Sequence, residues 1–244
     1  TTPELYVVAG VLGLVALALL ARARPLAPAT RLRLLQAAWL GAIPVSLVAG
    51  VVVNRMPLYD GLRHFLFLFP LLAALAGAAV AAFLRAPVGR PVRVAGMALL
   101  SLAGAVTLVD MVRLHPYESV YFNRLWAGGM KAGVARYEGD YFCLSYKEGS
   151  EWLRKQFAGK SCREPIRVAG YSVLQQTEHY LQKTEEGRRL FTAVAVADGR
   201  PHYVLATTRF QDHLRAPGKP VFTVERMGAT LFYLFEAQPP DCAP

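Results

Sequence analysis

Acidic side chains are almost absent from the first 112 residues of the chain. Only Glu4, Asp60 and Asp110 occur there, against nine arginines, whereas residues 113–244 hold eighteen basic and fourteen acidic side chains. A soluble globular chain does not separate its charges in this way. In a chain of 244 residues that is 54% hydrophobic, this imbalance predicts two parts that lie in unlike solvents.

Several catalytic and cofactor motifs are also absent. The sequence contains no C-x-x-C, G-x-S-x-G, H-E-x-x-H or G-x-x-x-x-G-K, and no G-x-G-x-x-G after a strand. These absences argue against a zinc or redox centre, a serine hydrolase and a nucleotide-binding loop, so we expect no cofactor and no metal. The net charge of +10 does not predict nucleic-acid binding, because the arginines of the first half lie between apolar runs.

Long apolar runs fill the first part, residues 1–112, and none of them alternates as a membrane strand would. A helix needs about 20 apolar residues to cross a bilayer core. We therefore expect an all-α membrane bundle of four transmembrane helices, kinked at Pro44 and Pro70 and packed through small residues such as Gly13 and Gly96. The expected spans are about 4–21, 34–53, 65–84 and 94–112.

Arginines in the connections predict the orientation of these spans. The first and third connections carry arginines and no acid, whereas the middle one, Asn54–His64, is mixed. By the positive-inside rule the first and third connections are cytoplasmic. The middle connection and everything after the fourth span are then extracytoplasmic. The arginines concerned are Arg22, Arg24, Arg31 and Arg33 in the first connection, and Arg85, Arg90 and Arg93 in the third.

Residues 113–145 are rich in aromatic side chains, which is typical of a segment at the membrane interface. Residues 146–244 predict a small extracytoplasmic α/β domain. Its first helix begins with the capping-box pattern Ser145-x-x-Glu148, and Ser172 is expected to cap a second helix. The expected strands are 166–169, 191–196, 203–207, 221–224 and 231–235, with a turn at Gly228.

All three cysteines, Cys143, Cys162 and Cys242, lie in the extracytoplasmic part, where a disulfide can persist. Cys143–Cys162 and Cys162–Cys242 are the two pairings that the spacing favours. Buried or incidental thiols are the alternative, and the odd number leaves one thiol over in any case.

The stretch Tyr59-Asp60-Gly61-Leu62-Arg63-His64-Phe65 lies at the mouth of the third expected span. Arg63 offers a planar fork of donors that fits phosphate oxygens, and a helix start adds free backbone N–H groups. We interpret Arg63 and His64 as ligands of an anionic headgroup, with Asp60 orienting them. The alternative is an interfacial loop whose arginine contacts lipid phosphates nonspecifically.

A second polar stretch follows the last expected span and contains His115, Tyr117, Glu118, Tyr121 and Asn123. His115 and Glu118 alone do not make a metal site. Hydrogen bonding and ring packing at the membrane interface are the expected roles. Asp110, near the end of the fourth span, is expected to be a structural anchor, although an acid at such depth is also a functional candidate.

Three sequence blocks resemble a known family. Tyr59 to Phe67 resembles the Y-D-G-x-R-H-x-x-F signature of bacterial polytopic glycosyltransferases with the GT-C fold, which are related to dolichyl-phosphate-mannose–protein mannosyltransferases. His115 to Asn123, followed by Gly128-Gly129 and Asp140-Tyr141, resembles the block after their last spans. Ser145 to Leu153 is similar to the start of their C-terminal domain. The resemblance covers roughly residues 40–160.

The resemblance implies transfer of a sugar from a polyprenyl-phosphate donor on the outer side of a bacterial inner membrane. Arg63 and His64 would hold the donor phosphate, and Tyr59 and Asp60 would shape the loop. The catalytic aspartate of the family has no counterpart in this sequence, and Phe142 replaces a tryptophan. We therefore expect the C-terminal portion of such an enzyme, inactive alone, whose partners are membrane lipids and the upstream transmembrane part. The alternative is a non-catalytic four-span anchor that presents an extracytoplasmic binding domain.

Overall fold

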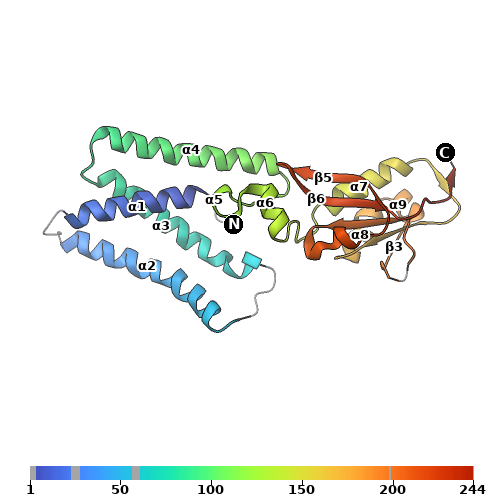
Figure 1. The fold of residues 1–244 in the computed structure, drawn as a ribbon, viewed down its shortest axis with the longest axis horizontal. Helices are drawn as coiled ribbons and strands as arrows, with labels where there is room; N and C mark the ends of the chain where they lie inside the picture. The colour runs from blue at the N-terminus through green and yellow to red at the C-terminus, as the bar shows by residue number, and fades with distance from the viewer. Residues whose placement is uncertain (1–3, 23–27, 57–60, 198, 244) are drawn as a thin grey trace. The chain divides into compact units, whose positions relative to one another are not determined.

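The computed structural model of the protein describes residues 4–22, 28–56, 61–197 and 199–243 (Figure 1). Two compact units make up the chain, Thr1–Asp110 and Met111–Pro244. The first unit is built from helices and the second from a mixed sheet with helices on it. The elements of the first unit are α1 (Glu4–Arg22), α2 (Pro28–Val53), the 3-10 helix η1 (Gly61–Leu68), α3 (Phe69–Arg85) and α4 (Arg90–Leu114), the last of which runs into the second unit.

The expectation of four transmembrane helices is wrong. Among the described residues, two helices are long and apolar enough to cross a membrane: Phe65–Arg85, which combines the end of η1 with α3, and Arg90–Leu114, which is α4. The apolar parts of the first two helices, Glu4–Gly13 and Ala38–Val53, are shorter. The first turns of α2 carry Arg31 and Arg33, and the apolar stretch of this helix is given by Ala38–Val53.

The surfaces of these two helices indicate association with a membrane. Only 6% of the apolar window of each is buried inside the protein. In α4, Leu102, Leu108 and Val112 are 60–70% exposed. A water-soluble surface does not usually present so continuous an apolar face.

Small residues allow close helix packing within the first unit, as the sequence predicts. A Cβ atom placed on Gly13 of α1 would lie 2.5 Å from the Cβ of Ala79 in α3, and one placed on Gly96 would lie 2.5 Å from the Phe83 ring. Pro44 lies inside α2. Pro70 instead occupies the first turn of α3, where the ring starts the helix rather than kinking it.

The second unit contains a five-stranded sheet of order β3-β2-β4-β6-β5. Strand β2 is parallel to both β3 and the central β4, and β6 is antiparallel to β4 and β5. All five strands match strands that the sequence predicts. Their bounds are β2 (Ile166–Gly170), β3 (Phe191–Val194), β4 (Tyr203–Thr207), β5 (Lys219–Arg226) and β6 (Ala229–Glu236). The other elements are η2 (Glu118–Val120), α5 (Arg124–Ala127), α6 (Gly129–Arg136), α7 (Tyr146–Phe157), β1 (Ser161–Cys162), α8 (Leu174–Leu181), α9 (Glu185–Leu190), η3 (Arg209–Gln211), α10 (Asp212–Arg215) and β7 (Cys242–Ala243).

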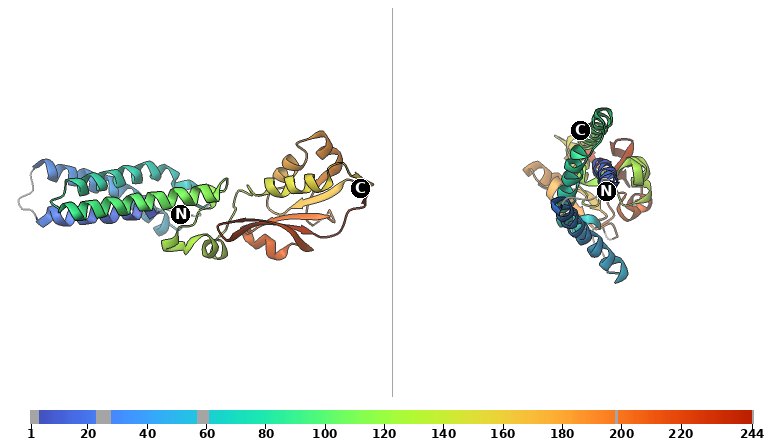
Figure 2. Two further views of the ribbon diagram at one scale, coloured as in Figure 1. Left: turned by 90° about the horizontal axis from the view of Figure 1, so that it is seen from above. Right: turned by 90° about the vertical axis from the view of Figure 1, so that its left-hand side faces the viewer.

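Helices cover both faces of this sheet (Figure 2). On one face Tyr146 of α7 packs edge-on against Phe232 of β6, with ring centroids 5.8 Å apart. On the other face His213 of α10 stacks on Tyr233, the next residue of β6, at 5.1 Å. Since successive strand residues point to opposite faces, α7 and α10 lie on opposite sides of the sheet.

The two predicted helix caps are wrong in mechanism. The described α7 does begin after Ser145, but the serine hydroxyl makes no cap bond and donates to Asp140 instead. Likewise the hydroxyl of Ser172 donates to Asp212, and α8 begins only at Leu174. In both places the hydroxyl donates to a carboxylate outside the expected helix, and neither serine side chain caps a helix.

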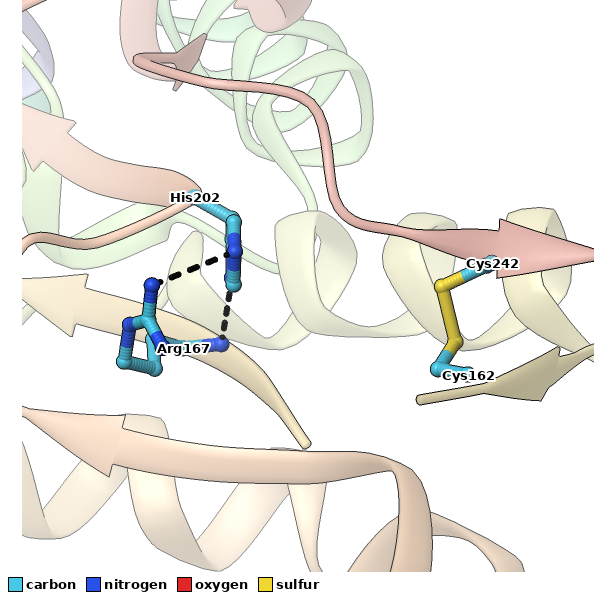
Figure 3. The surroundings of a disulfide bond; sticks show 4 residues. All are labelled: Cys162, Arg167, His202 and Cys242. Atoms are coloured by element: carbon cyan, nitrogen blue, oxygen red, sulfur yellow. Dashed lines mark hydrogen bonds between the residues drawn. A yellow bond between two sulfur atoms is a disulfide. The ribbon is translucent and has the colours of Figure 1, made fainter. Parts of the chain in front are cut away.

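A disulfide joins Cys162 of β1 to Cys242 of β7, which is one of the two pairings that the spacing favours (Figure 3). The intervening 80 positions include the whole five-stranded sheet. Cys143 is a free, buried cysteine. Burial and the nearby Asp140 carboxylate raise the pKa of its thiol to about 11, so the thiol stays protonated.

His202, which directly precedes β4, hydrogen-bonds to Arg167 of β2 (Figure 3). The ring Nδ1 of His202 accepts a hydrogen bond from the backbone N–H of Arg167 at 2.9 Å. The backbone N–H of His202 donates to the carbonyl of Arg167 at 2.8 Å. An accepting Nδ1 requires the neutral ring. Burial, followed by the charge of Arg167, lowers the pKa of His202 below its ordinary 6.5.

We expect that reduction of the disulfide destabilises the second unit by about 4 kcal/mol, because an open chain of this loop length regains closure entropy on unfolding. The melting temperature of the full chain in detergent, measured with and without dithiothreitol, checks this. Cys162→Ser/Cys242→Ser should melt like the reduced wild type and should not respond to the reductant. A wild-type melting temperature that ignores the reductant would contradict the expected stabilisation.

The depressed pKa of His202 makes stability depend on pH. Unfolded His202 takes up a proton near pH 6.5 and folded His202 only at lower pH, so its stabilising contribution is present above about pH 6.5 and is lost as the pH falls. His202→Asn keeps an acceptor for Arg167 but does not titrate. The melting temperature of the wild type should therefore fall more steeply than that of the variant between pH 7 and pH 5. Parallel curves would rule out His202 as the cause.

Candidate functional site

The Arg-His motif lies immediately before a candidate membrane span. Gly61 to Leu68 form η1, which continues directly into α3. Tyr59 and Asp60 lie outside the described residues, and the side chains of Arg63 and His64 are not described either. The arrangement of these four predicted donor-phosphate ligands therefore stays a prediction, and the structure contributes the helical backbone on which Arg63 and His64 are carried.

Tyr117, from the second predicted polar stretch, is buried and bonds to a partly exposed ion pair. Its hydroxyl donates to Oε1 of Glu148 at 2.7 Å, and Nη2 of Arg226 donates to the same oxygen at 2.5 Å. The Arg226 guanidinium also lies 4.9 Å from the centre of the Tyr117 ring. Burial and the hydrogen bond to Glu148 raise the pKa of Tyr117 far above its ordinary value, so it remains a donor.

The other residues of this stretch also have structural partners. His115 and Glu118 contact each other at the surface, with 2.7 Å between Nδ1 and Oε1. Hydrogen bonds from its own backbone and from His115 lower the pKa of Glu118. Tyr121 packs into the core, and the Asn123 side chain caps α5 by accepting from two backbone amides. Across the described ranges, no three His, Cys, Asp or Glu side chains are grouped so that they could hold a metal ion.

Asp140 is buried in the loop before α7 and organises it. Its carboxylate accepts hydrogen bonds from the backbone N–H groups of Leu144 and Ser145, at 3.0 and 2.7 Å, and from the Ser145 hydroxyl at 2.5 Å. Burial raises the pKa of Asp140, and these three hydrogen bonds oppose that shift. Asp110 is likewise buried, near the end of α4.

The carboxyl ends of β2 and β4 form a topological switch point. From β2 the chain passes through α8 and α9 to β3 on one side, and then returns to β4 on the other side. In open α/β sheets, ligands bind outside the strand ends at such a point. Polar residues meet there: the Asp212 carboxylate accepts from Ser172 at 2.7 Å and from Arg215 at 2.6 Å, while the Tyr171 hydroxyl donates to the Arg215 carbonyl at 2.8 Å.

A groove of about 760 Å³ adjoins this switch point on the face of the sheet that carries α10. Its lining includes Lys131 and Arg136 of α6, Phe210 and His213 of the segment after β4, and Tyr233 of β6. Sequence reasoning missed this site. The signal that could have found it is the run Thr-Arg-Phe-Gln-Asp-His, 208–213, because aromatic and ionisable side chains there directly follow a buried strand.

No protein-family model, curated protein or solved structure matches this chain.

Replacing Asp140 with alanine leaves three donors of the loop without their acceptor. We expect a loss of stability of about 2–4 kcal/mol, measured as a lower melting temperature of the full chain in detergent. Asp140→Asn keeps one acceptor oxygen and should lose less. Ser145→Ala removes one of the three hydrogen bonds and should cost about 1 kcal/mol. Equal melting temperatures for the wild type and Asp140→Ala would show that this loop does not depend on the carboxylate.

Proposed function

We propose that this chain is part of a membrane glycosyltransferase of the GT-C class that transfers a sugar from a polyprenyl-phosphate donor. The observation that carries the proposal is the position of Arg63-His64, in the turn of helix that opens the candidate span Phe65–Arg85. A helix start presents free N–H groups and the positive end of its dipole to an anion. Arginine and histidine at the same place suit the phosphate group of a lipid that is anchored in the bilayer.

The leaving group of the proposed transfer, the polyprenyl phosphate, determines what the site must stabilise. In transfer from a polyprenyl-phosphate sugar, the bond from the sugar to phosphate breaks and negative charge develops on the departing phosphate. A fixed cation beside that phosphate stabilises the developing charge. The general base that activates the acceptor is not among the residues of this chain that we assign. In the proposal it is supplied by the upstream transmembrane part of the same enzyme.

The sidedness of the proposal needs only the two helices that qualify as spans. The turn between α3 and α4 is flanked by Arg85, Arg90 and Arg93, and the positive-inside rule assigns it to the cytoplasm. If both helices cross the membrane, the start of the first and the end of the second face the same outer compartment. The donor motif and the second unit would then share the extracytoplasmic side of a bacterial inner membrane. The Cys162–Cys242 disulfide supports this, because such bonds persist in oxidising compartments.

Arg63→Ala in the complete enzyme should lower transfer by a factor of about 100 or more, because the departing phosphate loses its cation. Arg63→Lys keeps the charge without the fork of donors and should retain part of the activity. Transfer to acceptor is measured in membranes with a labelled polyprenyl-phosphate sugar, and membrane insertion is checked by extraction.

Arg55→Ala is the matched control, since it removes the same charge from the same connection outside the motif. It should leave transfer unchanged. Full activity of Arg63→Ala would remove Arg63 from the donor site. Absence of transfer by the wild type would instead favour a non-catalytic membrane protein that presents a binding domain.

A further inference from the structure

The groove of the second unit carries an excess of positive charge. Lys131, Arg136 and Arg215 line it, and Glu138 is the one acidic residue among its described lining. Lys131 and Arg136 form no ion pair within the described part of the chain. Cations that line one groove without acidic partners favour a negatively charged ligand.

Arg215 is held in place before any ligand arrives. Its Nη2 donates to the buried Asp212 carboxylate at 2.6 Å and to the Phe210 carbonyl at 3.0 Å. Asp212 is fixed in turn by the Ser172 hydroxyl. A guanidinium held in this way loses little conformational freedom on binding, and it still has N–H groups left to donate.

The walls also contain hydrogen-bonding atoms that are not used. The hydroxyl of Thr208 and Nδ1 of His213 are buried and have no hydrogen-bond partner among the described residues. Both residues line the groove. A polar atom left in this state is costly, and a ligand that carries hydroxyl groups can satisfy it after a small rotation of the side chain.

Flat rings provide the apolar part of the groove. The His213 ring stacks on Tyr233 with planes 10° apart, and the Phe210 and Tyr137 side chains are 58% and 52% exposed. Phe210 and Gln211 both adopt positive φ angles, 49° and 58°, which residues with a side chain rarely do. Strain of this kind collects at ligand sites, and here it lies in the turn that carries an exposed phenyl ring to the groove.

We propose that this groove binds an acidic sugar, that is, a saccharide that carries a carboxylate or a phosphate. Lys131, Arg136 and Arg215 recognise the anionic group, Thr208 and His213 bond to ring hydroxyls, and Phe210 and Tyr137 cover a face of the ring. The role of such a ligand as acceptor or product rests on the proposed glycosyltransferase, but its binding does not.

Calorimetric titration of the full chain in a neutral detergent tests the groove. The probes are D-glucuronate, glucose 6-phosphate, glucose and inorganic phosphate. We expect one or both acidic sugars to bind at least about tenfold more tightly than glucose or phosphate, and to weaken as salt is raised. Tighter binding of D-glucuronate would indicate recognition of a carboxylate, and tighter binding of glucose 6-phosphate would indicate recognition of a phosphate. Equal binding of inorganic phosphate, or no binding of either acidic sugar, would overturn the proposal.

Two double variants, one in the groove and one outside it, test whether the acidic sugars bind in the groove. Lys131→Ala/Arg136→Ala should weaken the acidic sugars by about tenfold or more. Lys155→Ala/Lys183→Ala removes the same charge from exposed positions outside the groove and should have no effect. Phe210→Ala should weaken sugars and leave phosphate unchanged. Equal losses in the two double variants would refute the assignment to the groove.

The proposal for the groove and the proposal for the donor site can be refuted independently of each other. Arg63→Ala should leave the titration unchanged, because the groove is built from residues of the second unit alone. Loss of transfer in Arg63→Ala together with absent sugar binding would refute the groove only. Sugar binding that depends on Lys131 and Arg136, together with full transfer by Arg63→Ala, would support the groove and refute the donor site.

Discussion

One carboxylate oxygen, Oε1 of Glu148, receives hydrogen bonds from both Tyr117 and Arg226. These partners come from the segment after α4, from α7 and from β5, which are otherwise far apart in the sequence. Arg226 also donates to the carbonyl of His115. A carboxylate that is partly removed from water is stabilised by such donors, which here join the three segments. This junction links α7 to β5, beside the ring contacts of Tyr146 with Phe232 and of Trp152 with Phe222.

Sequence patterns predicted the sheet well and the surroundings of the sheet poorly. Its strands are runs of β-branched and aromatic residues, and such runs form strands wherever they can be buried. The caps failed because the hydroxyls of Ser145 and Ser172 donate to the carboxylates of Asp140 and Asp212, which the capping pattern does not reveal. The number of spans failed for a different reason. Hydrophobicity located α1 and α2 as helices, but among the described residues their apolar stretches, Glu4–Gly13 and Ala38–Val53, are shorter than a bilayer span requires.

The two candidate sites also differ in how far the sequence alone predicts them. Arg63-His64 is found by sequence alone, because a basic pair before an apolar run depends on neighbouring residues only. The groove depends on α6, β6 and the turn after β4, which are separated by about a hundred positions and meet only in the folded sheet. Its cations are ordinary surface residues in the sequence. Two of them, Lys131 and Arg136, have no acidic partner among the described residues, which becomes visible only when the neighbours are known.

The polar blocks that suggest chemistry in the sequence are for the most part already occupied in the fold. Tyr117 donates to Glu148, Asn123 caps a helix, and Asp140 accepts three hydrogen bonds. A group whose hydrogen-bonding capacity is spent within the protein has little left for a substrate. Ligand chemistry in the second unit must therefore come from side chains that the fold leaves unsatisfied. Such side chains collect in the groove beside the switch point, where the cations of α6 face the strained turn after β4.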